Sequence, residues 1–201
     1  PVSIITAIFA TVLTLILVSG LNKKTITSIV GTIGGVVFAG IIAILFSKVA
    51  KLTGLSSEEA QMLMFAPLKV EFNFQGLLFA GIILGALGAV MDVSMSIASS
   101  INELRTVNPG LKAKELFSGG MNVGKDIMGT MTNTLILAYA GASIQLMLLF
   151  MAYNVPIDKI INSDMIATEV VRALTGTLGL LVAIPLTAFI GSILMEKKSK
   201  L

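Results

Sequence analysis

Long uninterrupted runs of apolar residues dominate the chain and predict membrane-spanning helices. A helix needs about 20 apolar residues to cross the hydrocarbon core of a bilayer. Five runs meet this requirement, namely residues 1–21, 26–47, 74–101, 127–153 and 173–195. The runs are continuous rather than alternating, which argues against barrel strands, and in lipid a helix satisfies its backbone groups within one segment. We therefore predict an all-α, polytopic helical membrane protein that forms a single transmembrane domain over residues 1–201.

Short interfacial helices are expected in two of the loops. Ser56 and Glu59 form the pattern of a capping box and predict a short helix that ends before Pro67. The apolar residues of this helix favour a position in the outer interface. A similar short helix is expected on the inner side over residues 111–117. If the protein couples to a cytoplasmic ATPase, residues 105–117 should form a short helix that protrudes from the membrane surface.

Composition excludes several classes of protein. Hydrophobic residues make up 55% of the chain and charged residues 12%, against about 45–50% and about 25% in typical soluble domains. There is no Cys and no His, which removes thiol nucleophiles, common zinc sites, haem histidine and Ser-His-Asp chemistry. Nucleotide-binding and zinc-protease motifs are also missing. We predict that the chain is not an enzyme and uses no cofactor or metal. The net charge of +3 is explained by loops that face anionic lipid rather than by nucleic acid.

Basic residues in the loops predict the orientation, because Lys and Arg accumulate on the cytoplasmic side. With five spans the two chain ends lie on opposite sides of the membrane. Placing the C-terminal tail inside puts nine basic residues inside, namely Lys23, Lys24, Arg105, Lys112, Lys114, Lys125, Lys197, Lys198 and Lys200. Five then lie outside, namely Lys48, Lys51, Lys69, Lys159 and Arg172. We expect a cytoplasmic C-terminus. Since the chain begins at Pro1 within an apolar run, we also expect residues before it.

The third run carries a polar stripe along one side of its predicted helix. At about 100° per residue, six small or polar residues fall within about 40° of Asp92. They are Gly81, Gly85, Gly88, Ser96, Ser99 and Glu103. Glycines at such spacing let another helix approach closely, and a carboxylate at this depth is expected to face protein or water rather than lipid. The glycines Gly81, Gly85 and Gly88 are therefore candidate packing residues, and Asp92 is either a functional group or a structural partner of Lys125, Asn122 or Asn133.

The fourth and fifth runs repeat this arrangement. Asn122, Thr130 and Asn133 lie within about 40° of Asp126. If the third and fourth helices are antiparallel neighbours, their polar sides could form a conduit suited to a proton, Na⁺ or a cationic solute. Its candidate residues are Asp92, Ser96, Ser99, Asn122, Asp126, Thr130 and Asn133. Glu169 and Arg172 are three apart and could pair. As structural alternatives, Lys125 and Asp126 could be boundary anchors, and the Glu169–Arg172 pair could be exposed.

Three sequence blocks resemble the YibE/F family of bacterial multi-pass membrane proteins. The blocks are Gly85–Ile97 continuing to Ser100–Leu104, Gly120–Leu135, and Asn162-Ser163 with Ile166–Arg172 and Ala183–Pro185. They extend from about Gly76 to Thr187, and the chain is similar to the shorter partner type of the family. The resemblance implies an all-helical protein of the bacterial inner membrane and a paralogous membrane subunit as partner. Transport has been considered for the family, but the resemblance transfers no catalytic residue set.

Two main hypotheses remain. The first is a transport-related protein or permease subunit whose acidic conduit lies between the third and fourth helices. The second is a non-catalytic scaffold that docks a paralogous subunit or a second copy through the glycine side of the third helix, while the loop of residues 102–126 holds a cytoplasmic partner. An intramembrane aspartyl protease using Asp92 and Asp126 is the weakest reading, because the usual Gly-Leu-Gly-Asp context surrounds neither residue.

Overall fold

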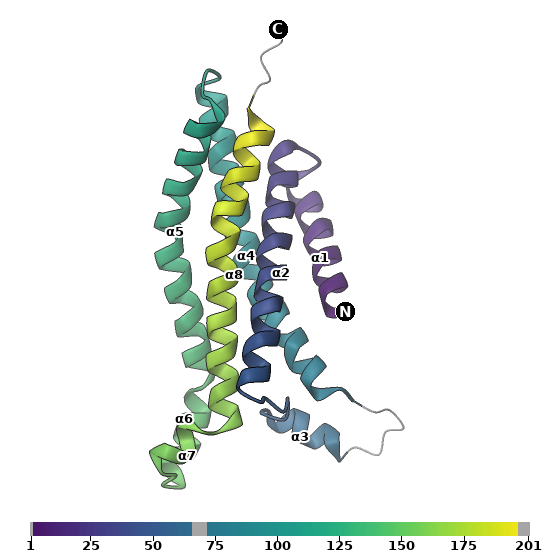
Figure 1. Ribbon diagram of the computed structural model, residues 1–201, viewed down its shortest axis with the longest axis vertical. Coiled ribbons are helices and arrows are strands. Elements are labelled where there is room, and N and C mark those ends of the chain that lie inside the picture. The colour runs from purple at the N-terminus through teal and green to yellow at the C-terminus, as the bar shows by residue number, and fades with distance from the viewer. Residues whose placement is uncertain (1, 66–71, 197–201) are drawn as a thin grey trace.

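The computed structural model describes residues 2–65 and 72–196, and within them it contains eight helices and no strand (Figure 1). The helices are α1 (Val2–Ser19), α2 (Lys23–Val49), α3 (Glu58–Met64), α4 (Phe74–Val107), α5 (Ala113–Ala142), α6 (Ile144–Ala152), α7 (Ile157–Ile161) and α8 (Asp164–Met195). Six residues used in the sequence analysis lie outside the described part, namely Pro1, Pro67, Lys69, Lys197, Lys198 and Lys200. The all-α prediction is confirmed.

Four helical segments are long and apolar enough to cross a membrane: α2, α4, α5 with α6, and α8. The first predicted span is a shorter apolar helix over Ile5–Ser19. The fourth begins earlier than expected, because the short helix predicted over residues 111–117 is not separate. From Ala113 onward these residues form the first turns of α5. The hairpin between α4 and α5 is therefore a tight turn of residues 108–112, without the protruding helix that coupling to an ATPase would predict.

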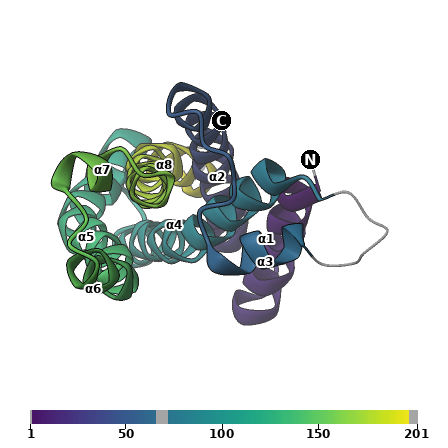
Figure 2. The same ribbon diagram turned by 90° about the horizontal axis from the view of Figure 1, so that it is seen from below.

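The centre of the bundle is formed by α2, α4 and α8, which all pack against one another. Helix α1 lies against α2 and α4 on one side, and α5 lies against α8 and α4 on the other side (Figure 2). The α1–α2 turn, the α4–α5 hairpin and the end of α8 share one end of the bundle, called here the hairpin end (Figure 1). Helices α3, α6 and α7 lie at the opposite end, called here the α3 end.

A seam of small residues brings α2 and α8 into very close contact. In antiparallel register, Thr27, Gly31, Gly35 and Ala39 of α2 meet Gly191, Thr187, Ala183 and Gly179 of α8. A Cβ atom added to Gly35 would lie 2.7 Å from the Ala183 Cβ and 3.0 Å from the Gly179 carbonyl oxygen. Spacing of four residues on both helices keeps every small residue on the contact side. Such close backbone approach is a main source of helix association in membranes.

Side-chain caps and interhelical hydrogen bonds fix the two ends of the bundle. At the hairpin end, the Ala113 N–H donates to Glu196 Oε1 at 3.0 Å and thereby ties α5 to the end of α8. At the α3 end, the Thr53 hydroxyl donates to Asp164 Oδ2 at 2.6 Å. Helix α3 starts one residue later than the capping-box pattern predicts, because the Ser57 hydroxyl caps it by accepting from the Ala60 N–H at 3.2 Å.

Candidate functional site

Asp92 lies near the middle of α4, on the side that faces away from the bundle core. It is 18 residues from the first residue of α4, or about 27 Å along the helix. The core side of α4 carries buried apolar residues such as Val90 and Ile97, and Val90 is about 160° from Asp92 around the helix. Asp92 itself is exposed. The structure therefore places this carboxylate on the outer surface of the chain.

The other residues of the predicted stripe share this side of α4. Gly81, Gly85, Gly88, Ser96 and Glu103 are exposed, and Ser99 is half-buried. A Cβ atom added to Gly81 or Gly88 would meet nothing within 4 Å. These glycines thus pack against no helix of the described chain, whereas the seam glycines of α2 and α8 do. We call Gly81, Gly85, Gly88, Asp92, Ser96 and Ser99 the α4 polar face.

The polar residues of α5 also face outward. Asn122, Asp126, Thr130 and Asn133, called here the α5 polar face, are all exposed. Helix α5 contacts α4 through its glycines instead, since Cβ atoms at Gly120 and Gly124 would contact Ile101 and Ile97.

Helices α4 and α5 therefore contact each other through apolar residues, and not through their polar faces as the sequence predicted. Among the described residues, neither Asp92 nor Asp126 forms a hydrogen bond or an ion pair with another side chain. The expected pairing of Asp92 with Lys125, Asn122 or Asn133 is therefore not seen within this part of the chain. In the described residues, the two polar faces lie on the exposed surface rather than against each other.

A polar cluster lies between α5 and α8, nearer the α3 end. Arg172 Nη1 donates to Glu169 Oε1 at 2.7 Å, and the two side chains are 29% and 24% exposed. The pair is joined through a single nitrogen, so Arg172 Nε and Glu169 Oε2 remain buried without a hydrogen-bond partner. The Tyr139 hydroxyl is also buried and without a partner. We call Tyr139, Glu169 and Arg172 the α5–α8 cluster.

Tyr139 connects this cluster to α4. Its hydroxyl lies 3.4 Å from the position of a Cβ on Gly176 and 3.5 Å from that of a Cβ on Gly85. Gly85 belongs to the α4 polar face and lies seven residues, or about 10 Å, from Asp92. The two polar regions are therefore neighbours along α4. Sequence reasoning identified the Glu169–Arg172 spacing but did not connect Tyr139 with it, because that contact depends on how α5 packs.

The core of the bundle contains hydroxyl groups that the sequence analysis did not single out. Ser28, Thr32 and Thr175 are fully buried, and their hydroxyl oxygens have no hydrogen-bond partner. The Thr187 hydroxyl donates to the Ala183 carbonyl at 2.6 Å and lies 3.2 Å from the Ser94 hydroxyl. The described residues contain no group of three His, Cys, Asp or Glu that could hold a metal ion.

Long apolar helices, joined by short turns and packed through small residues, define a multi-pass helical membrane protein. Comparison with known families then identifies the particular group. The family model described as YibE/F-like protein matches residues 1–197, so the chain belongs to the YibE/F family. The resemblance seen in the sequence is thereby confirmed. No curated protein and no solved structure matches the chain.

Proposed function

We propose that this protein is a subunit of a transport assembly in the bacterial inner membrane and that the α4 polar face lines a path where it meets a neighbouring subunit. The exposure of Asp92 near the middle of α4 carries this proposal. A charged side chain at the centre of a helix in lipid costs about 2.5–3.5 kcal/mol on insertion scales. Protein or water must therefore cover this side of α4 in the membrane, and the described residues of this chain leave it exposed.

The chemistry of the path favours a cation. Asp92 supplies a carboxylate, and Ser96 and Ser99 supply hydroxyl oxygens toward the hairpin end. Oxygen ligands of this kind suit a proton, Na⁺ or a cationic solute. The neighbour is a paralogous subunit or a second copy of this chain, with the hairpin end and the C-terminus in the cytoplasm. The proposal includes no enzymatic activity.

A scaffold is the second candidate, and the open space beside Gly81 and Gly88 favours it. Glycines without a neighbour of their own chain allow the helix of another subunit to approach closely. In that case the covered face is dry, and Asp92 is paired with a polar group of the partner. The two candidates differ in one measurable property, which is access of water to the α4 polar face.

Cysteine labelling in native membranes tests the proposal, and the chain has no cysteine of its own. We expect Ser96→Cys to react with a hydrophilic thiol reagent, because that position lines a hydrated path. The control is Val30→Cys on α2, which is 41% exposed but apolar. Its helix lies beside α4 at this level, since a Cβ on Gly31 would lie 3.3 Å from the Ser94 hydroxyl. The control should react at least about tenfold more slowly, because thiols in lipid are poorly ionised.

A second variant distinguishes the two candidates. A photo-crosslinking amino acid in place of Gly88, which reacts with C–H bonds of whatever lies beside it, should link to a neighbouring subunit under either candidate. If position 88 cross-links but Ser96→Cys reacts as slowly as Val30→Cys, the α4 polar face is covered by protein and is dry. That result would reject the path and support the scaffold. If the photo-crosslinking residue at position 88 links to no neighbour and Ser96→Cys is unreactive, no neighbour and no water cover this face, and both candidates are wrong.

A further inference from the structure

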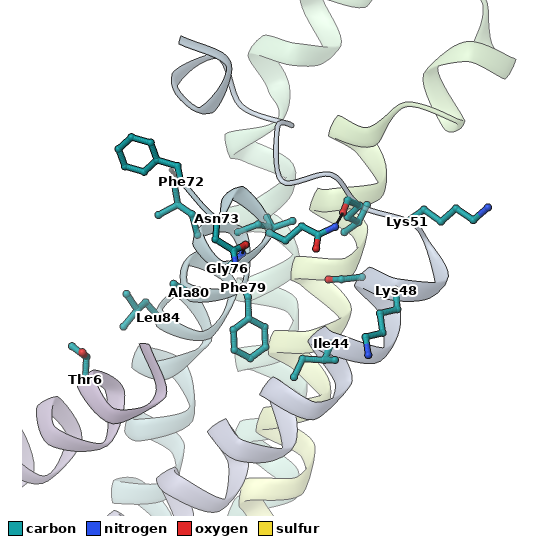
Figure 3. A pocket seen from close by; sticks show the side chains of 15 residues that line it. Thr6, Ile44, Lys48, Lys51, Phe72, Asn73, Gly76, Phe79, Ala80 and Leu84 are labelled. Atoms are coloured by element: carbon teal, nitrogen blue, oxygen red, sulfur yellow. Dashed lines mark hydrogen bonds between the residues drawn. The ribbon is translucent and has the colours of Figure 1, made fainter. Parts of the chain in front are cut away.

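A groove opens at the α3 end between the beginning of α1, the end of α2 and the beginning of α4. Its volume is about 1090 Å³ (Figure 3). Apolar side chains form most of its lining, among them Ile44 of α2 and Phe79 and Leu84 of α4. Figure 3 shows Phe79 between Ile44 and α1. Because the three helices are apolar on their outer sides, the groove lies beside the hydrocarbon of the bilayer. Water alone is a poor occupant there, since a bound water needs two to four polar partners.

Two lysines stand at the end of this groove where α2 leaves the membrane. Lys48 lies in the last turn of α2, and Lys51 follows the helix. Both are exposed, and neither forms a salt bridge within the described residues. Long lysine side chains at helix ends carry their charge to the headgroup level while their methylene groups stay in apolar surroundings. The groove thus combines an apolar interior with a cationic mouth at the depth of lipid phosphates.

The backbone at Lys51 is unusual for a lysine. Its φ is +52°, in the left-handed region. The Leu52 N–H donates to the Ser47 carbonyl at 3.0 Å and the Lys51 N–H to the Lys48 carbonyl at 3.3 Å, a helix ending at which glycine is the usual residue. A residue with a Cβ costs about 1 kcal/mol in this conformation. Glycine at this position would therefore make the folded state more stable. Lysine instead supplies a positive charge at the mouth of the groove.

We propose that the groove binds one anionic phospholipid, with its acyl chains against Ile44, Phe79 and Leu84 and its phosphate at Lys48 and Lys51. Charge complementarity selects this occupant, because lysine ammonium groups form charge-assisted hydrogen bonds with phosphate oxygens. A zwitterionic phospholipid would fill the apolar part equally well, but the positive charge of its own headgroup would offset the attraction between its phosphate and the two lysines. The proposal does not depend on the α4 polar face, so it stands or fails separately from the transport function.

The test measures the melting temperature of the purified protein in detergent as phospholipid is added. Phosphatidylglycerol should raise the melting temperature in a saturable way, because a ligand that binds only the folded state stabilises it. Phosphatidylcholine with the same acyl chains should raise it much less. Native mass spectrometry should detect one retained phosphatidylglycerol. Lys48→Gln/Lys51→Gln should weaken binding at least about tenfold, whereas Lys23→Gln/Lys24→Gln, the same charge change at the other end of α2, should not.

Two further variants protect the result against misfolding. Lys51→Gly removes the charge and relieves the left-handed strain, so its melting temperature without lipid should equal or exceed that of the unchanged protein while the shift with phosphatidylglycerol falls by about half. Ala80→Phe narrows the groove and should weaken lipid retention without changing any charge. Equal shifts with phosphatidylcholine or with inorganic phosphate, or an unaltered shift in Lys48→Gln/Lys51→Gln, would overturn the proposal.

Discussion

Gly35→Val should lower the free energy of unfolding by about 3 kcal/mol, at the upper end of the usual range for overpacking. Gly35 lies in the middle of the α2–α8 seam. A Cβ there would be 2.7 Å from the Ala183 Cβ, 2.8 Å from Val90 Cγ1 and 3.0 Å from the Gly179 carbonyl oxygen. The carbonyl oxygen belongs to the backbone of α8 and cannot rotate away, so the two central helices must separate. Unfolding by a denaturing detergent in mixed micelles measures the loss.

Gly141→Val is the matched control, because a Cβ at Gly141 of α5 meets nothing within 4 Å. It introduces the same side chain into a helix but disturbs no contact, and its effect should stay within about 0.5 kcal/mol. If Gly35→Val is as stable as Gly141→Val, α2 and α8 do not pack in the register described here.

Arg172→Met should destabilise the protein by about 2–3 kcal/mol because it leaves the Glu169 carboxylate without its partner. Loss of one member of a buried ion pair costs about 3–5 kcal/mol. The smaller value is expected here because the two side chains are 29% and 24% exposed, and solvent screens them in part. The double variant Glu169→Gln/Arg172→Met removes both charges and should recover at least half of the loss. The same unfolding assay on both variants gives the comparison.

Tyr139→Phe separates the ion pair from the rest of the α5–α8 cluster. The Tyr139 hydroxyl is buried and has no hydrogen-bond partner, so removing it should be neutral or stabilising by up to about 1 kcal/mol. A loss of stability in Tyr139→Phe would mean that the hydroxyl is hydrogen-bonded in the membrane.

The outcome for Glu169→Gln/Arg172→Met tests the ion pair itself. If this double variant is less stable than Arg172→Met alone, the unpaired Glu169 carboxylate is not the cause of the loss, and the explanation given for Arg172→Met is wrong.

The sequence was sufficient to predict the helices, but it was less informative about where they begin and end. Apolar length locates a span because the bilayer imposes one, and all five runs are helical. The polar ends of the helices are under no such constraint. Residues 113–126 therefore read as a loop with a short helix, whereas they continue α5 through Gly119, Gly120 and Gly124, which pack against α4 and α8. Glycine between polar residues suggests a flexible segment until its packing partner is known.

The sidedness of α4 could be derived from the sequence, but what covers it could not. Helical periodicity places Asp92, Ser96 and the three glycines on one side, and the structure shows that side exposed. In a soluble protein the polar side would have been assigned to solvent at once. In a membrane, lipid and protein interior are equally apolar, so hydrophobicity does not indicate which side of a helix is buried. The signal in the sequence for the α2–α8 seam was the repeat of small residues at Thr27, Gly31, Gly35 and Ala39. The glycines of α4 have similar spacing and were predicted to be the packing residues instead.

The uneven attachment of α5 has a mechanical consequence. Leu116, Gly120 and Gly124 near its first turns are buried, but none of the described residues from 125 to 142 is. Ile127, Met128, Met131 and Leu135 still pack against the core, but only from partly buried positions. This part of α5 is therefore held less firmly than its first turns. These 18 less buried residues span about 27 Å, so a tilt of α5 by about 10° about its first turns would displace their far end by about 5 Å. Such a swing would carry Tyr139 away from Gly85 and Gly176 while the hairpin stays in place.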